Sequence, residues 1–139
     1  MPSMLHAIAA LALLTLGVYF LMTILGIAAK AKGQLSDEYS LTKTGAPPPA
    51  WVGNAARNLI NLCELPLLFY VWAGMLYATG MPVDGMALML AWGFVASRYA
   101  HTFVHVTINN MALRFLLHRI GAVILAVMWV QFLLALQIR

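Results

Sequence analysis

The chain has 139 residues, of which 63% are hydrophobic and only 9% are charged, and its mean hydropathy is +0.88. A soluble domain would carry roughly a quarter charged residues, so the composition indicates an integral membrane protein with a single domain, residues 1–139. The net charge of +4 is scattered and forms no basic patch, which argues against nucleic acid as a partner. The single cysteine, Cys63, excludes an internal disulfide.

Four apolar stretches follow one another along the chain, each long enough for a membrane span of about 20 residues. A polar segment follows the first stretch and ends in three prolines and Trp51. Pro66 lies inside the second stretch, where we expect a kink or a weakened turn, and Pro82 suits the first turn of the third helix. Asn109 and Asn110 separate the third stretch from the fourth. We therefore expect an all-α membrane protein, an up-down four-helix bundle with spans at about 4–29, 54–78, 83–107 and 111–136.

The charges in the loops predict an orientation. Four spans place both termini on the same side of the membrane. The loop after the first span contains three lysines and Arg114 borders the loop after the third, whereas the opposite side offers Arg139. The positive-inside rule therefore predicts that the first and third loops face the cytoplasm and that both termini lie outside.

Three groups of polar residues interrupt the apolar stretches, and the spacing within each group places its members on one helical face. In chain order the groups are Arg57, Asn61 and Glu64; Arg98, His101 and His105; and Arg114 with His118. At a rise of about 1.5 Å per residue, all three lie toward the cytoplasmic face, with Glu64 and Arg98 deepest, roughly 15 Å in. Ionisable residues inside spans are costly and usually line a functional cavity.

The depths of these groups predict contacts and a ligand class. Glu64 and Arg98 lie at similar depth with opposite charge, so we expect them to form an ion pair, because an unpaired buried charge is strongly destabilising. The rim of the cavity is basic, and the starts of the second and fourth helices add positive dipole ends. We therefore expect the cavity to accept an anionic, polar ligand from the cytoplasm. Its apolar walls also suit a lipophilic molecule from the bilayer.

Two other interpretations remain open from the residues alone. Polar side chains inside spans can simply hydrogen-bond helices together. His101 and His105, at i and i+4, can also share a metal ion, with His118 and Glu64 as further ligands. Arginines surround the same place and would repel a cation, so no metal site is assigned.

Three segments resemble a known family. Arg57-Asn-Leu-Ile-Asn61-Leu-Cys-Glu64-Leu-Pro66 resembles the second-helix signature of the MAPEG family, the membrane-associated proteins in eicosanoid and glutathione metabolism. Arg98-Tyr-Ala-His101 resembles the family's third-helix arginine-x-x-histidine segment, and Arg114 lies where the family has its fourth-helix arginine. The resemblance covers essentially the whole chain and is greatest for a bacterial branch of the family.

The resemblance implies a homotrimer in a bacterial inner membrane that binds glutathione between subunits, near the cytoplasmic face. It also implies a transferase or peroxidase in which Arg114 faces the glutathione sulfur and favours the thiolate, the form that attacks a lipophilic electrophile. The alternative is a non-catalytic member that binds lipid or acts as a scaffold. The expected glutathione-binding residues are Arg57, Asn61, Glu64, Arg98, His101, His105 and His118, the last two standing where well-studied members often have tyrosine.

Overall fold

The computed structural model describes residues 3–138, and the regular structure there is entirely helical. In chain order the helices are α1 (Met4–Ala31), α2 (Asp37–Thr42), α3 (Ala50–Ala78), α4 (Gly85–Val106) and α5 (Met111–Gln137). The predicted all-α class is confirmed. Arg139, which contributes to the predicted orientation, lies outside the described residues.

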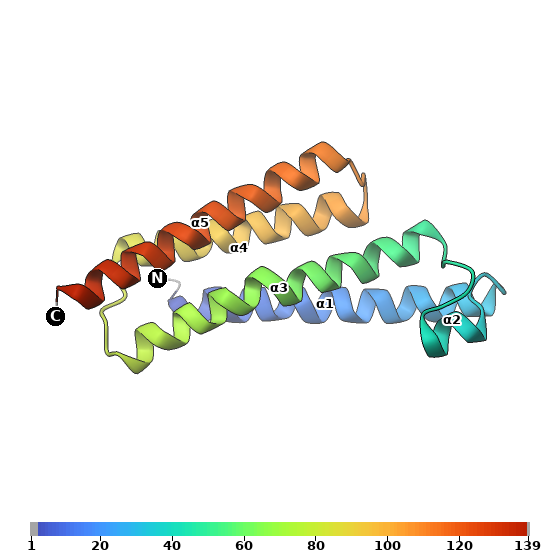
Figure 1. The fold of residues 1–139 in the computed structure, drawn as a ribbon, viewed down its shortest axis with the longest axis horizontal. Helices are drawn as coiled ribbons and strands as arrows, with labels where there is room; N and C mark the ends of the chain where they lie inside the picture. Colours follow the sequence, from blue (N-terminus) through green and yellow to red (C-terminus); the bar gives the residue numbers. More distant parts are fainter. Residues whose placement is uncertain (1–2, 139) are drawn as a thin grey trace.

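The four long helices lie side by side as two pairs, α1 with α3 and α4 with α5 (Figure 1). The pairs meet because α1 and α3 both contact α4, and α3 also contacts α5. One end of the molecule holds α2, the start of α3 and the α4–α5 turn, and we call it the α2 end. The other end holds the start of α1, the α3–α4 turn and the end of α5, and we call it the terminal end (Figure 1).

Side chains at the helix starts explain where α4 and α5 begin. The backbone N–H of Ala87 donates to Asp84 Oδ1 (2.7 Å), and that of Leu113 donates to Asn110 Oδ1 (3.0 Å). Each side chain satisfies an N–H group that a helix start leaves without a partner. Pro82 lies in the turn before α4 rather than in its first turn, which corrects the predicted position.

The polar segment between the first two long helices is more ordered than the sequence indicates. Its short helix α2 was not predicted; the Tyr39 N–H donates to Ser36 Oγ (3.1 Å) and two acidic residues occupy the first turn. Both features stabilise a helix start. The next helix, α3, begins directly after the third proline, earlier than predicted, and continues through the buried Pro66.

Three of the long helices, α1, α3 and α5, are long and apolar enough to cross a membrane. Large apolar side chains such as Leu13, Ile24 and Val123 are more than half exposed on their outer faces, which suits contact with lipid. The fourth long helix, α4, has 22 residues, about 33 Å at the usual helical rise. Its assignment as a fourth span, and with it the four-span bundle, stays a prediction.

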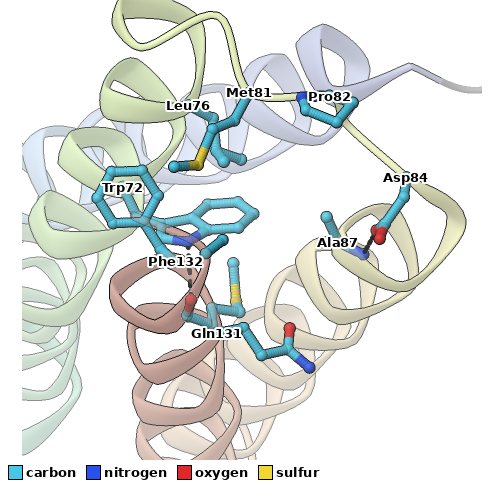
Figure 2. A pocket seen from close by; sticks show the side chains of 10 residues that line it. Trp72, Leu76, Met81, Pro82, Asp84, Ala87, Gln131 and Phe132 are labelled. Atoms are coloured by element: carbon cyan, nitrogen blue, oxygen red, sulfur yellow. Dashed lines mark hydrogen bonds between the residues drawn. The ribbon is translucent and has the colours of Figure 1, made fainter. Parts of the chain in front are cut away.

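The packing changes from apolar to polar along the molecule. In the terminal half, Phe69 of α3 stacks on Phe94 of α4 with ring centroids 5.2 Å apart, and Phe132 of α5 is buried nearby in the same cluster. Trp72 Nε1–H donates to the Met128 carbonyl (3.0 Å) and so ties α3 to α5 (Figure 2). The half toward the α2 end buries polar side chains instead: Asn58, Ser97, Arg98, His101, Thr102 and His105. This polar half holds the candidate site.

Candidate functional site

A cavity of about 220 Å³ joins α3, α4 and α5, and we call it the polar cavity. It brings together five of the eight predicted site residues. They are Asn61 and Glu64 from α3, His101 from α4, and Arg114 and His118 from α5, with Met111 and Phe115 completing the lining. The helix directions thus place side chains that lie far apart in the sequence around one space. Their roles as ligand contacts stay predictions.

Hydrogen bonds hold Arg114 and His101 in the cavity wall. Arg114 Nη1 donates to Asn109 Oδ1 (2.8 Å) in the α4–α5 turn. His101 Nδ1 lies 3.1 Å from the Arg114 carbonyl; because a carbonyl only accepts, Nδ1 carries the proton and Nε2 is left as an acceptor. His101 Nε2 and Arg114 Nε are both buried without a hydrogen-bond partner among residues 3–138. The wall therefore offers one acceptor and one donor to a ligand or to water.

The three histidines lie close together around His101. The His101 ring centroid is 5.6 Å from that of His105 and 5.6 Å from that of His118. His105 is fully buried, does not line the polar cavity, and has no hydrogen-bond partner for either ring nitrogen within the described chain. In residues 3–138, no group of three or more histidine, cysteine, aspartate or glutamate side chains is placed to hold a metal ion.

The predicted ion pair between Glu64 and Arg98 was wrong. Arg98 Nη2 donates instead to two carbonyls of α5, those of Leu117 (3.0 Å) and His118 (3.3 Å). Within residues 3–138 the ion pair that forms is Lys30 with Asp37, and Glu64 is exposed in the single chain. The physical reason is the rotation of α4 about its axis. Arg98 projects from the side of α4 that packs against α5, so its hydrogen-bond partners are α5 carbonyls and not groups of α3.

Arg98 lies outside the lining of the polar cavity and is only 1% exposed. Its guanidinium lies over the Phe94 ring, with Cζ 5.5 Å from the centroid, and against α5 at Gly121. A Cβ at Gly121 would lie 2.9 Å from Arg98 Cζ and 2.7 Å from Ser97 Oγ, so the missing side chain makes room for the arginine. Sequence reasoning missed Gly121, although a lone glycine inside a helical pattern often marks a close approach.

Helical spacing selected Arg57 of α3 as a site residue and missed its neighbour Asn58, which is the buried one of the two. Arg57, a predicted site residue, is exposed, bonds to Asn54 (Nη2 to Oδ1, 2.6 Å), and does not line the polar cavity. Asn58, which was missed, is fully buried; its Oδ1 accepts from Thr102 Oγ1 (3.4 Å), while its Nδ2 has no partner in the described residues. Buried polar atoms of this kind usually bind internal water. The sequence signal that could have identified Asn58 is an asparagine inside an apolar stretch.

A second cavity, of about 200 Å³, lies at the terminal end between α3, α4 and α5 (Figure 2). Of its three polar side chains, Asp84 caps α4 and Trp72 donates to Met128, which leaves the Gln131 amide. The rest of its lining is mainly apolar, including Met81 and Phe132. This cavity offers no set of groups for acid–base or nucleophilic chemistry, so the polar cavity is the candidate site.

Comparison with known families decides the identity of the chain. The model of the MAPEG family matches residues 4–134, nearly the whole length. The chain belongs to the MAPEG family. No curated protein and no solved structure matches this MAPEG protein. The predicted family is thereby confirmed, and the polar cavity of this MAPEG protein lies between α3, α4 and α5, the helices that carry the three resembling segments.

Proposed function

We propose that this MAPEG protein is a membrane-embedded, glutathione-dependent transferase or peroxidase. The observation that carries the proposal is the convergence of Arg114, Glu64 and Asn61 in one cavity at the α2 end. Glutathione has two carboxylates, which suit the arginine and amide donors of the cavity, and an ammonium group, which suits the Glu64 carboxylate. The buried donor at Arg114 Nε and the buried acceptor at His101 Nε2 support binding of a polar ligand.

Arg114 is the residue proposed to act on the sulfur. A free thiol has a pKa of about 8.5, and a nearby cation lowers that pKa, so Arg114 raises the fraction of the nucleophilic thiolate. His101 Nε2, an acceptor in the same wall, can take the thiol proton directly or through water. In the transfer reaction a sulfur–carbon bond then forms to a lipophilic electrophile, and the leaving group departs with its electron pair.

The size of the cavity and the exposure of Glu64 support an assembly. Ligand sites are usually about 300–1,000 Å³, larger than the polar cavity of one chain. An exposed carboxylate on a spanning helix is costly unless another group covers it. We infer that further copies of the chain complete the site in a homotrimer. Three lysines support a cytoplasmic position for the α2 end in a bacterial inner membrane: Lys30 and Lys32 at the end of α1, and Lys43 at the end of α2.

The decisive experiment compares two arginines of α5. Arg114→Ala removes the cavity cation, whereas Arg119→Ala removes an exposed arginine that does not line the polar cavity. With glutathione added, the wild type and Arg119→Ala should show ultraviolet thiolate absorbance and conjugate a chlorinated nitrobenzene. Arg114→Ala should lose the absorbance and about 100-fold or more in turnover, the usual effect of removing a stabilising donor.

Two outcomes would separate the alternatives. If the wild type fails to bind glutathione at millimolar concentration, the proposed function is wrong. If it binds glutathione but neither conjugates a broad panel of electrophiles nor reduces lipid hydroperoxides, the protein is a binding member of the family without turnover.

A further inference from the structure

Two more cavities lie end to end along the seam between α1 and α3, and we call them together the α1–α3 furrow. The first, of about 600 Å³, lies under α2 and is lined by residues that include Gly26, Ile27 and Ile60. The second, of about 520 Å³, continues toward the terminal end along Leu16 and Leu67. On α3 the two linings follow one another at helical spacing, from Val52, Ala56 and Ile60 to Cys63, Leu67 and Tyr70, so they lie along one face of that helix. On α1 six residue positions separate Leu16 of the second lining from Met22 of the first.

The chemistry of the furrow differs between its two ends. Lys30 and Lys43 line it only beside α2, together with the Tyr39 and Ser40 side chains. Toward the middle of the molecule its lining is apolar apart from Thr15, Cys63 and Tyr70. The Thr15 hydroxyl is already engaged, because it donates to the Leu11 carbonyl (3.1 Å). The furrow therefore has a cationic end at the surface and an apolar body.

Both lysines can still bind an anion. Lys30 Nζ lies 2.9 Å from Asp37 Oδ1, but both side chains are more than half exposed, and exposed ion pairs exchange partners readily. Lys43 Nζ donates to the Ser40 carbonyl (3.3 Å) and lies over the Tyr39 ring, 5.7 Å from its centroid. Neither contact neutralises the charge of Lys43. Within residues 3–138, Asp37 pairs with Lys30 and no carboxylate pairs with Lys43, so Lys43 stays available to an anion.

We propose that the α1–α3 furrow is a binding site for an anionic phospholipid, with the phosphate at Lys30 and Lys43 and one acyl chain in the apolar body. The lining of the first cavity runs along α1 from Lys30 to Met22, about 12 Å of helix. One leaflet of a bilayer has about 15 Å of hydrocarbon, so the chain of a lipid whose headgroup lies at α2 can fill the first cavity and reach the near edge of the second on α3. The lysines at one end and the apolar body suit an amphiphilic anion better than the apolar helix face of a second copy.

The test of headgroup recognition uses native mass spectrometry of protein released from mixed micelles of phosphatidylglycerol and phosphatidylcholine with identical acyl chains. A surface lysine favours anionic lipid by about fivefold, so the wild type should retain phosphatidylglycerol roughly twentyfold better. Lys30→Gln with Lys43→Gln should abolish that preference. Lys32→Gln with Arg119→Gln removes the same charge outside the furrow and should keep it.

A second pair of variants tests occupation of the furrow independently of charge. Gly26 lines the first cavity and Gly17 does not, yet a Cβ at either position meets no atom within 4 Å. Gly26→Leu should fill the furrow and reduce retained phosphatidylglycerol at least fivefold, whereas Gly17→Leu should leave it unchanged. Equal retention of the two lipids by the wild type, or full retention by Gly26→Leu, would overturn the proposal. Neither readout uses glutathione, so the proposal stands or falls separately from the catalytic one.

Discussion

At the scale of single residues, Arg98 shows how a buried cation is held without a carboxylate. The guanidinium lies between the Phe94 ring and the α5 backbone, where the Leu117 and His118 carbonyls accept its hydrogen bonds. Gly121 permits that approach because it has no side chain. A buried charge is tolerated only while such partners remain in place. Arg98 therefore joins α4 to α5 directly behind His118, a residue of the polar cavity.

This arrangement predicts that Gly121→Ala lowers stability. The added methyl group would overlap the Arg98 guanidinium, and overpacking of this kind costs about 1–3 kcal/mol. Gly17→Ala is the matched control, because its Cβ points into open space on α1 and alanine favours a helix by up to about 1 kcal/mol. Thermal unfolding in detergent should show a lower midpoint for Gly121→Ala and an equal or higher one for Gly17→Ala. Equal midpoints for Gly121→Ala and the wild type would show that Arg98 can lie elsewhere.

The error over Arg98 has a physical cause that sequence reasoning cannot remove. Residue spacing and helix direction give the depth of a side chain, and the convergence of Asn61, His101 and His118 depended on depth. The direction in which a helix is rotated depends on how its small and large side chains pack against a neighbour. Only the packed structure shows that Gly121 lies against Arg98.

At the scale of helices, the long ones were predictable and the short one was not. Apolar runs of span length bounded by Asn109, Asn110 and the three prolines gave the long helices to within a few residues. Helix α2 was not predicted, because six residues are too few to show a helical hydrophobic pattern and the helix depends on its Ser36 cap. The start of α4 matters for the site as well, because this helix, capped by Asp84, carries His101 into the polar cavity.

We predict that the Asp84 cap sets the stability of α4. Asp84→Ala leaves the Ala87 N–H without its partner at 2.7 Å and should lower the free energy of unfolding by about 1 kcal/mol. Asp84→Asn keeps a side-chain acceptor and should lose only a few tenths of that amount. Chemical denaturation in detergent measures both variants. A loss as large in Asp84→Asn as in Asp84→Ala would mean that the charge, and not the cap, is what matters.

At the scale of the whole molecule, one chain leaves an ionisable side chain open on a long helix. Glu64 is exposed, and the polar cavity that it lines is small for a tripeptide. The membrane character and the family could be predicted from composition and from three short segments, and both are confirmed. The homotrimer stays a prediction, because residues of another copy that would cover Glu64 would leave no periodic signal in the sequence around it.

The proposed assembly predicts that glutathione stabilises a trimer. If glutathione bridges subunits at Glu64, its addition should raise the trimer fraction in native mass spectrometry under increasing activation. Glu64→Ala should lose most of this effect. Glu38→Ala removes an exposed carboxylate of α2 outside the polar cavity and should keep it. A monomer or dimer at all protein concentrations, or a trimer indifferent to glutathione, would contradict the proposed site between subunits.

The change from apolar to polar packing along the molecule has a consequence for how such a sequence can vary. Substitutions at well-separated positions usually act independently on stability. The stacked rings of Phe69 and Phe94 and the Trp72 bond join helices in the terminal half, and none of these side chains lines the polar cavity. Exposed side chains of the polar cavity, such as Glu64 and Phe115, can therefore be exchanged with little effect on the free energy of unfolding. Packing in the terminal half therefore stabilises the fold, while exposed positions of the polar cavity can change and so accept other ligands.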